Sequence, residues 1–331
     1  MGAVTGPGGR PILATFDFPE RTRWVARVDG LDAQELGPAG LVRAVLREAR
    51  GREAVVVDGS VGPGNRYADL VAAVALRRRP GAAPPVLVAE CTWSAGRGGA
   101  VRAARRAAVR LLDGPRVGYC VLSSTERDRF GRQWGVAGER VTFTPYCYTF
   151  SETELDPPED LGAGVFSGGN SLRDYGPLLD VAGGLGAPVT LATKRIAPDR
   201  LAALGDGVQA GAVPHERFVA LTRAARVVVV ALADRDDRSA GQQSYLNAMA
   251  LGRLVVVPDL MGVRDYIDDG RTGLIVPPGD RAALARTLAW ALDPANDERV
   301  REIGRAAAAD VRSRFSPERY ADALLEAVDA L

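Results

Sequence analysis

Residue types that commonly carry metal or redox chemistry are scarce in this sequence. Its three cysteines, Cys91, Cys120 and Cys147, are widely spaced and share no metal-ligand spacing, and it contains a single histidine, His215. We therefore predict buried free thiols and no metal site built on cysteine or histidine. Lysine is scarce as well: Lys194 is the single lysine among 42 Lys and Arg residues.

Long apolar runs and a charge imbalance are also absent. No run approaches the roughly 18 to 20 apolar residues that cross a bilayer, and residues 1–10 lack an apolar secretory core. The formal net charge is +1, with 47% hydrophobic and 25% charged residues. These values predict a soluble, cytoplasmic globular protein with no overall preference for nucleic acid.

The length of 331 residues fits two domains of roughly 150 residues each. In the first half, short apolar runs alternate with stretches long enough for right-handed helical crossovers, so the strands should be parallel. The predicted strands are Ile12–Phe16, Ala54–Val57, Val86–Ala89, Gly118–Leu122 and Val141–Thr144. Helices are predicted at or near Gly40–Arg50, Tyr67–Arg79, Gly99–Leu112 and Thr125–Gly135.

The alternation restarts after an acidic segment with a Pro-Pro pair, SETELDPPEDLGAG, at residues 151–164. This segment lacks apolar periodicity and is predicted as a linker. The strands predicted beyond it are Val165–Phe166, Val189–Ala192, Val208–Ala210, Val227–Leu232, Leu254–Val257 and Leu274–Val276.

These patterns predict the α/β class, with two doubly wound, Rossmann-like domains whose parallel sheets face each other across a cleft. The predicted parts are an N-terminal domain at 1–150, the linker at 151–164, a C-terminal domain at 165–315 and a last helix at 316–331. We expect the last helix to pack back toward the N-terminal domain. Ligands should bind at the carboxyl ends of the strands.

A loop of small residues follows the first strand of the C-terminal half, at Gly168, Gly169 and Asn170. Such a loop lets backbone N–H groups approach a phosphate, and the next helix N-terminus adds partial positive charge. Arg173, just beyond the loop, can pair with a diphosphate. A tight turn followed by a solvated arginine would explain the same residues without a ligand.

The segment SAGQQSYLNAMALG, at 239–252, is predicted to begin as a loop and continue as a helix. N–H groups in the first turn should point out of the helix start, and two amide side chains four residues apart share a face that can meet ribose or a sugar. The candidate ligand-binding residues of this segment are Ser239, Gly241, Gln242, Gln243, Ser244 and Asn247.

Three stretches resemble the C-terminal domain of the retaining GT-B glycosyltransferases of family 4. They are GAVPHERFVALTRAARVVVVAL, SAGQQSYLNAMALGRLVVVPDLMGVRDYIDDGRTGLIVPPGD and FSPERYADALLEAV. An earlier stretch, SSTERDRFGRQWGVAGERVTFTP, resembles the end of that family's N-terminal domain. The resemblance implies a nucleotide-sugar donor on the C-terminal domain, an acceptor on the N-terminal side, and no cofactor or required metal.

The sequence departs from the family pattern at four positions. The family typically has two glutamates eight positions apart, the first contacting the sugar and the second the ribose, and Ser239 and Asn247 hold these places. Alignment of YGPLLDVA puts Arg173 at the place of a phosphate-binding lysine and Gly168 at the place of an arginine. Lys194 is a candidate to replace the lost charge, with a solvated loop lysine as the alternative.

The resemblance also assigns two positions near the predicted strand Val208–Ala210. The backbone near Val213 lies where the family's nucleotide base sits. His215 falls in VPHERF, where the family commonly has a histidine at a helix start, so we predict capping or packing rather than a catalytic base.

Three strands of the N-terminal half end in carboxylates, at Asp17, Asp58 and Glu90. In a parallel sheet these side chains emerge at one edge, where they could bind acceptor hydroxyls or a cationic amine, or act as general base. Simple capping of the next helix is the alternative interpretation, and the spacing does not favour a metal.

The predicted helix Gly99–Leu112 is amphipathic and basic. One face holds Val101, Ala104, Ala108, Leu111 and Leu112, and the arginines Arg102, Arg105, Arg106 and Arg110 lie broadly opposite. A solvated arginine face explains this pattern, and so does peripheral contact with an anionic membrane surface.

Our leading hypothesis is a retaining glycosyltransferase that uses a nucleoside-diphosphate sugar and a small-molecule, glycan or lipid-linked acceptor. Two rivals stay open. Loss of both family glutamates is compatible with a GT-B pseudoenzyme that binds a nucleotide or activates a partner transferase. An inverting transferase would use Asp17, Asp58 or Glu90 as its base.

Overall fold

The chain divides into two units, of which unit 1 comprises Met1–Pro145 and Pro317–Leu331 and unit 2 comprises Tyr146–Ser316. The computed structural model describes residues 11–18, 23–60, 67–79, 83–96, 98–156, 158, 160–197, 200, 207–234 and 238–331. The segment 151–164, predicted as a linker, lies within unit 2.

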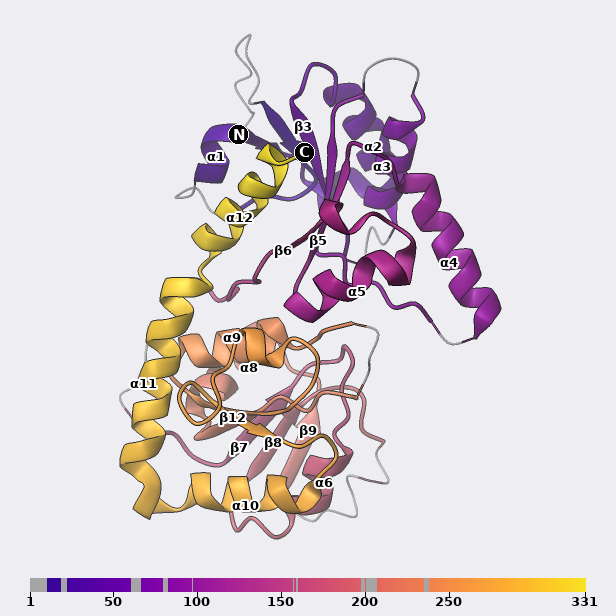
Figure 1. Ribbon diagram of the computed structural model, residues 1–331. Helices are drawn as coiled ribbons and strands as arrows, with labels where there is room; N and C mark the ends of the chain where they lie inside the picture. The colour runs from indigo at the N-terminus through magenta and orange to yellow at the C-terminus, as the bar shows by residue number, and fades with distance from the viewer. Residues whose placement is uncertain are drawn as a thin grey trace. The chain divides into compact units, whose positions relative to one another are not determined.

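Unit 1 is built on a six-stranded sheet with the order β2-β1-β3-β4-β5-β6, in which every pairing is parallel (Figure 1). Its strands are β1 (Ile12–Ala14), β2 (Val28–Gly30), β3 (Ala54–Asp58), β4 (Val86–Ala89), β5 (Val117–Val121) and β6 (Val141–Phe143). Because β2 and β3 lie on opposite sides of β1, the direction of winding changes between β1 and β3. Doubly wound sheets bind ligands at the carboxyl side of such a switch point.

Helices cover both faces of this sheet, which explains why strands such as AVVVD are continuously apolar. The helices of unit 1 are α1 (Arg23–Arg27), α2 (Ala33–Glu48), α3 (Ala68–Arg77), α4 (Gly99–Leu112), α5 (Ser124–Trp134), the short η1 (Gly138–Arg140) and α12 (Pro317–Asp329). On one face α2 to α5 bury Leu41, Leu76, Leu112 and Phe130 in a common core. On the other, α12 packs against α1, β4 and β5.

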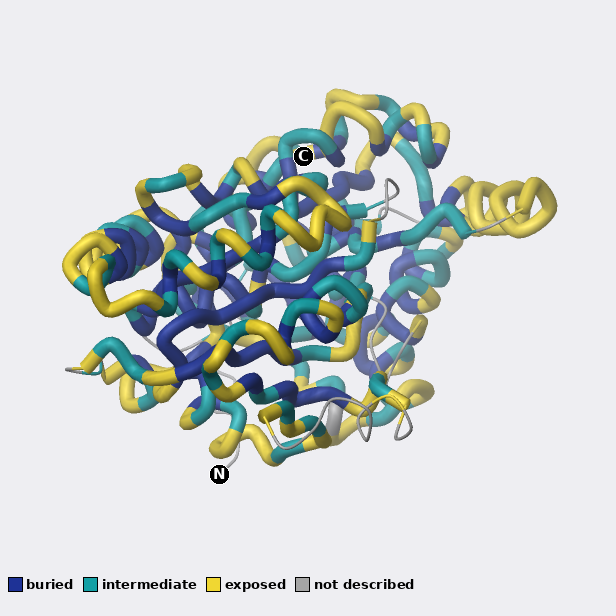
Figure 2. Tube along the Cα trace, turned by 90° about the horizontal axis from the view of Figure 1, so that it is seen from below, coloured by how far each residue is buried: buried dark blue, intermediate teal, exposed yellow. Residues whose placement is uncertain are grey.

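Helix α4 is exposed along most of its length, as Figure 2 shows at its right edge. Of its residues only Val109 and Leu112 are buried, whereas Val101 and Leu111 are 44% and 49% exposed. Most of the apolar face predicted from the sequence, including Ala104 and Ala108, therefore lies on the surface. Among the described helices, none has the length and apolar composition that spanning a membrane requires.

Unit 2 contains a second six-stranded parallel sheet, with the order β12-β11-β10-β7-β8-β9. Its strands are β7 (Val165–Gly168), β8 (Val189–Ala192), β9 (Val208–Gly211), β10 (Val227–Val229), β11 (Leu254–Pro258) and β12 (Leu274–Val276). Numbered from β7, this is the 3-2-1-4-5-6 order of dinucleotide-binding folds. Its switch point lies between β7 and β10.

The helices of unit 2 also lie on both faces of the sheet (Figure 1). They are α6 (Gly176–Ala182), α8 (His215–Ala224), α9 (Gln242–Ala250), η2 (Val263–Asp265), α10 (Arg281–Leu292), η3 (Pro294–Asn296) and α11 (Asp297–Arg314). Helices α8 and α9 lie on one side, while α6 and α10 enclose the core on the other with Leu178, Leu284 and Leu288.

The structure confirms the predicted fold class of two doubly wound α/β domains with parallel sheets. Every predicted strand is present, with ends that move by at most three residues. Helix α1 and strand β2 are not predicted from the sequence, because elements of five and three residues are too short for a periodic pattern. Helix α2 begins at Ala33 rather than near Gly40, since it continues across a kink at Gly37, whose φ is +63°.

The close packing of α11 on the end of α9 gives a test of the fold of unit 2. A Cβ on Gly304 would lie 2.1 Å from the carbonyl oxygen of Gly252. Alanine normally stabilises a helix interior by about 1 kcal/mol relative to glycine. We predict the opposite sign for Gly304→Ala, with the free energy of unfolding of unit 2 lowered by about 2 kcal/mol in urea denaturation.

The matched control is Gly183→Ala, at the end of α6, where no atom lies within 4 Å of the added Cβ. This control should change the free energy of unfolding by less than about 0.5 kcal/mol. A Gly304→Ala protein that is more stable than the native one would contradict the contact.

Candidate functional site

The loop after β7 lies at the switch point of unit 2. Gly169 has a φ of +112°, a backbone conformation that favours glycine. A Cβ on Gly168 would lie 2.4 Å from the ring of Phe218, so this position has no room for the arginine of the family pattern unless Phe218 moves. The Asn170 side chain ties the loop to the end of β8, because its Oδ1 accepts hydrogen bonds from Thr193 Oγ1 at 3.0 Å and the Lys194 N–H at 3.2 Å.

Arg173 folds back over this loop. Its Nε donates to the Gly168 carbonyl at 3.2 Å, its Nη1 to the Ser171 carbonyl at 2.7 Å and its Nη2 to Ser244 Oγ at 2.7 Å. The preceding residue, Leu172, has a φ of +47°. Left-handed backbone at a non-glycine residue is strained and is concentrated at functional sites. These contacts fix the guanidinium between the loop and the start of α9.

No described carboxylate neutralises Arg173. The charges that act on it are those of the Tyr175 and Tyr245 hydroxyl groups, and burial lowers the pKa of its guanidinium. Its three described hydrogen bonds go to uncharged oxygens. A desolvated cation without a counter-charge costs free energy that a bound anion would offset.

Helix α9 begins beside Arg173 with two unused N–H donors. Gly241 caps the helix with a φ of +90°. The first helical bond in this turn is donated by Ser244, and the N–H groups of Gln242 and Gln243 make no hydrogen bond to any described residue. Together with the helix dipole, these donors create partial positive charge at the switch point.

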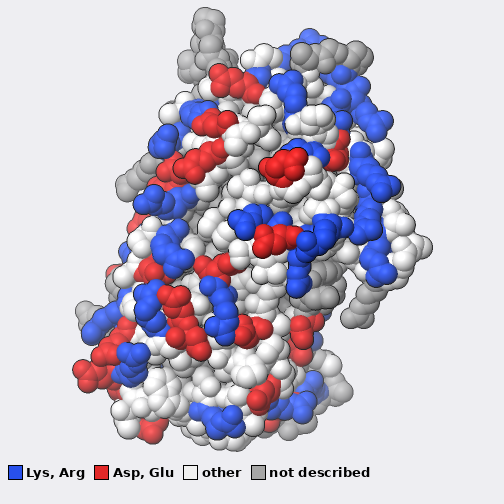
Figure 3. Space-filling model, viewed as in Figure 1, with Lys and Arg blue, Asp and Glu red and all other residues white. Residues whose placement is uncertain are grey.

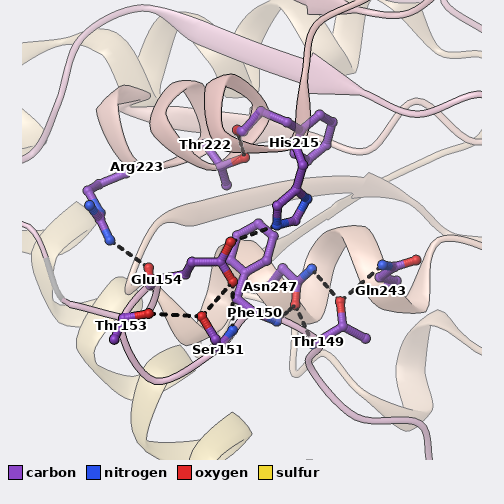
Figure 4. Close-up of polar contacts among 11 residues, drawn as sticks. Thr149, Phe150, Ser151, Thr153, Glu154, His215, Thr222, Arg223, Gln243 and Asn247 are labelled. Atoms are coloured by element: carbon purple, nitrogen blue, oxygen red, sulfur yellow. Dashed lines mark hydrogen bonds and ion pairs between the residues drawn. The ribbon is translucent and has the colours of Figure 1, made fainter.

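Asn247, which the sequence places toward a ribose, is satisfied inside unit 2 instead (Figure 4). Its Oδ1 accepts the N–H groups of Thr149 at 2.7 Å and Phe150 at 3.3 Å, and its Nδ2 donates to Thr149 Oγ1 at 3.1 Å. Gln243 Nε2 donates to the same Oγ1 at 3.0 Å. The predicted ligand partner of Asn247 is thus replaced by the backbone of residues 149 and 150.

Ser239, at the place of the other family glutamate, is also engaged internally. It is buried, and its Oγ accepts a hydrogen bond from Gln242 Nε2 at 2.6 Å. Neither position therefore presents a free acid or a free amide to a sugar, whereas Gln243 is exposed.

His215 is the first residue of α8 and contacts the same segment as Asn247 (Figure 4). Its Nε2 lies 2.6 Å from Glu154 Oε1, and its ring meets the edge of Phe150. Hydrogen bonds from the Ser151 backbone, and then from the Ser151 and His215 side chains, lower the pKa of Glu154. His215 therefore packs against and pairs with residues 150–154.

The structure adds cations that the sequence analysis did not select. Arg195 Nη1 donates to the Asn170 carbonyl at 2.7 Å, and Arg238 Nη2 donates to Ser171 Oγ at 3.2 Å. Lys194 itself is exposed. Arg195 could have been found from its position, since it follows Lys194 just beyond the end of β8. Val213 is half-buried in the loop between β9 and α8.

Unit 1 brings together two of the three predicted carboxylates. Asp58 ends β3 and Glu90 follows β4, and the charge of Asp58 acts on Glu90. The strand ends are joined by the Gly59 N–H, which donates to the Ala89 carbonyl at 2.6 Å. Glu90 has a φ of +51°, again a strained conformation.

The pKa of Glu90 is raised to about 8, mainly by burial and next by the nearby charge of Asp58. A hydrogen bond from Tyr320 Oη to Glu90 Oε1, at 3.3 Å, lowers this pKa by less than Asp58 raises it. Burial also raises the pKa of Asp58, against two hydrogen bonds from Ser60 that lower it. The pair therefore retains a proton near neutral pH.

The third predicted carboxylate has a different environment. Asp17 is exposed, and its Oδ1 accepts the N–H of Phe18 at 2.8 Å, which is a local capping contact. In its place the structure supplies Asp69, in the first turn of α3, which is 6% exposed and whose pKa is raised by burial and by Asp58. Asp69 does not stand out in the sequence, because an acid in the first turn of a helix ordinarily interacts with the helix dipole.

Part of unit 2 matches a known family. Residues 186–293 match the family described as Glycosyl transferases group 1. The matched segment includes the end of β8, the start of α9 and both positions of the missing glutamates. No curated protein matches the sequence.

Solved glycosyltransferase structures share the fold of the chain at low sequence identity. A glycosyltransferase from Rickettsia africae ESF-5 is 12% identical, with a TM-score of 0.62 over 97% of this chain and 89% of that one. Alr3699/HepE of Anabaena in complex with UDP is 16% identical, with a TM-score of 0.67 over 92% and 87%. The sucrose-phosphate synthase of Thermosynechococcus elongatus is 19% identical, with a TM-score of 0.62 over 89% and 78%.

These similarities confirm the predicted resemblance. The two doubly wound units have the GT-B fold, and residues 186–293 match the Glycosyl transferases group 1 family.

The raised pKa of Glu90 predicts how stability depends on pH. The folded protein holds this proton up to about pH 8, whereas an ordinary glutamate loses it near 4.5. The contribution of Glu90 is therefore present at low pH and is lost as the pH rises through 8. From pH 5 to pH 9, the free energy of unfolding of the native protein should fall relative to Glu90→Gln by on the order of 3 kcal/mol.

Urea denaturation at a series of pH values measures this difference. Asp128→Asn, at an exposed carboxylate of α5, is the control and should follow the native protein at every pH. A difference between native and Glu90→Gln that stays constant from pH 5 to 9 would contradict the protonated pair.

Proposed function

We propose that this chain is a retaining glycosyltransferase whose unit 2 binds the diphosphate of a nucleotide-sugar at the β7–β10 switch point. The observation that carries the proposal is Arg173, a desolvated cation with no described carboxylate partner, placed between a glycine loop and two unused N–H donors of α9. The family match of residues 186–293 and the UDP complex of the Anabaena neighbour support this choice of ligand.

The proposed chemistry requires stabilisation of the leaving group. As the sugar departs, negative charge develops on the diphosphate, where Arg173 and the N–H groups of Gln242 and Gln243 would meet it. Lys194 and Arg195, at the end of β8, are placed to add positive charge near the same loop. Neither needs to transfer a proton.

Retention of configuration follows from a front-face mechanism in which the departing phosphate accepts the proton of the acceptor. Such a reaction does not require a carboxylate at Ser239 or Asn247. Both Asn247 and Gln243 bond Thr149, but Asn247 is buried whereas Gln243 is exposed, so Gln243 is the side chain of α9 that we propose for ribose or sugar recognition. The backbone near Val213 would contact the base.

A pseudoenzyme that binds a nucleotide without transfer is the second candidate. The internal hydrogen bonds of Ser239 and Asn247 favour it, because both positions have lost the side chains that contact the donor in the family pattern. The two candidates agree on diphosphate binding and differ in turnover.

The first test is the affinity of the Arg173→Gln variant for UDP. Loss of a charge-assisted contact of about 1.5 to 3 kcal/mol should weaken binding roughly 10- to 150-fold in isothermal titration. Arg286→Gln, at an exposed position of α10 on the other side of the sheet, should bind UDP as the native protein does. Equal affinities of native and Arg173→Gln protein would exclude the proposed diphosphate site.

Turnover separates the two candidates. A transferase releases sugar from a bound nucleotide-sugar or transfers it, and NMR of the product should show the anomeric configuration of the donor. UDP binding without any sugar release would favour the pseudoenzyme, and an inverted product would support a carboxylate base in unit 1.

We also propose that α4 places unit 1 at an anionic membrane surface. Arginines gather along α4 on the face shown in Figure 3. Arg105 and Arg106 donate to backbone carbonyls of Ser94 and Gln133, and the exposed Arg102 and Arg110 lie broadly opposite the apolar row. An exposed apolar stripe with arginines on the polar face is typical of a helix that lies in the headgroup region.

This placement predicts lipid-dependent sedimentation. Each arginine near an anionic surface contributes about 1 kcal/mol, so Arg102→Gln/Arg110→Gln should weaken binding to vesicles that contain phosphatidylglycerol by roughly 30-fold. The matched control, Arg286→Gln/Arg305→Gln, removes the same charge from unit 2 and should bind as the native protein does. Equal binding to neutral vesicles, or no effect of the α4 pair, would contradict the placement.

A further inference from the structure

Three carboxylates lie near the switch point of unit 1, and no described cation is paired with any of them. Asp58 ends β3, Glu90 follows the neighbouring β4, and Asp69 starts α3 and is held by a hydrogen bond from Thr15 at the end of β1. Asp58 acts electrostatically on both of the others. Among the described residues, no arginine or lysine contributes to the field at any of the three.

Asp69 gives an independent indication that a partner is missing. Asp69 is 6% exposed, yet its buried Oδ1 accepts no hydrogen bond from any described group. A buried carboxylate oxygen without a donor costs on the order of 1 to 3 kcal/mol. The Asp69 carboxylate is hydrogen-bonded to Thr15 and to the backbone of Asp58, at the carboxyl ends of β1 and β3. This is the edge of a doubly wound sheet at which ligands bind.

A metal ion does not fit this arrangement. No described set of three or more His, Cys, Asp or Glu residues has the geometry to hold one. The carboxylates therefore suit a larger cation that contacts them through separate hydrogen bonds. A primary ammonium group has a full positive charge and three N–H donors, so it would supply both the positive charge that no described residue gives these carboxylates and a donor for Asp69 Oδ1.

An aromatic surface adjoins the acids. Tyr320 of α12, whose hydroxyl contacts Glu90, packs edge to face with Phe18, with ring centroids 5.6 Å apart. Phe18 in turn meets Trp24 at 5.1 Å, and Trp24 stacks with Phe16 at 5.6 Å. Phe16 and Phe18 are half-buried, so part of this surface is accessible. Aromatic rings bind the apolar faces of sugars and attract cations.

We propose that Asp58, Asp69 and Glu90 form the acceptor subsite and that the acceptor is an amino sugar or a similar amine-bearing ring, held through its ammonium group. The proposal rests on the transferase function proposed above and specifies the acceptor class. The ammonium supplies a donor for Asp69 Oδ1 and the counter-charge that no described residue gives the three carboxylates, and the ring lies against the aromatic residues that follow β1.

The test compares D-glucosamine with N-acetyl-D-glucosamine, which keeps the ring but removes the charge. Isothermal titration of the full-length, UDP-saturated protein should show glucosamine binding at least tenfold more tightly. Glu90→Gln and Asp58→Asn should each weaken glucosamine binding at least tenfold while leaving the affinity for UDP unchanged. Asp128→Asn, an equal change of charge at an exposed position in unit 1, should alter neither affinity.

Equal affinity for the two sugars, absence of glucosamine binding, or normal glucosamine binding by Glu90→Gln would overturn the acceptor proposal. Thermal unfolding of each variant shows whether it is folded, and Asp58→Asn supplies a second test where Glu90→Gln is not. The donor proposal is judged separately by UDP binding. If the protein binds UDP through Arg173 and does not distinguish the two sugars, the donor proposal holds and the acceptor proposal fails.

Discussion

The half-buried Arg173 guanidinium, which no described carboxylate neutralises, is the group on which the interpretation of unit 2 depends. Burying a cation costs free energy unless an anion or a set of dipoles compensates it. Here the compensation comes from the neutral oxygens of Gly168, Ser171 and Ser244, which orient the group without neutralising it. The surrounding geometry, from the positive φ of Leu172 and Gly169 to the unused N–H groups of α9, is consistent with a site prepared for an anion.

Unit 1 shows the same kind of imbalance with the opposite sign. Burial raises the pKa values of Asp58, Asp69 and Glu90 near its switch point, the charge of Asp58 raises those of Asp69 and Glu90 further, and no described basic residue offsets them. Both units therefore carry unneutralised charge at the ligand-binding edge of a doubly wound sheet. Charge of this kind is common at functional sites and rare in packing cores, because it lowers stability unless a ligand compensates it.

Much of the fold could be predicted from the sequence because buried parallel strands leave a strong apolar signal. Strands such as β3 and β8 were located to within a residue, while α1 and β2 were too short for any period to be visible. The glycine loop and Arg173 were also found, since strand, loop and helix are contiguous in the chain.

Contacts between distant segments could not be predicted in this way. Asn247 bonds to Thr149, 98 positions away, so its use as an internal anchor is set by the tertiary structure and not by its neighbours on α9. Likewise, Asp69 joins Asp58 only because α3 begins beside the ends of β1 and β3. The sequence showed that the family glutamates are absent, and the structure shows that Ser239 and Asn247 satisfy their own hydrogen bonds.

A crystal structure of the full-length protein with a bound nucleoside diphosphate would test the central claim most directly. The account predicts phosphate oxygens within hydrogen-bond distance of the Arg173 guanidinium and of the Gln242 or Gln243 N–H. A diphosphate bound elsewhere, with Arg173 still bonded to Gly168, Ser171 and Ser244 and no anion beside it, would contradict the account.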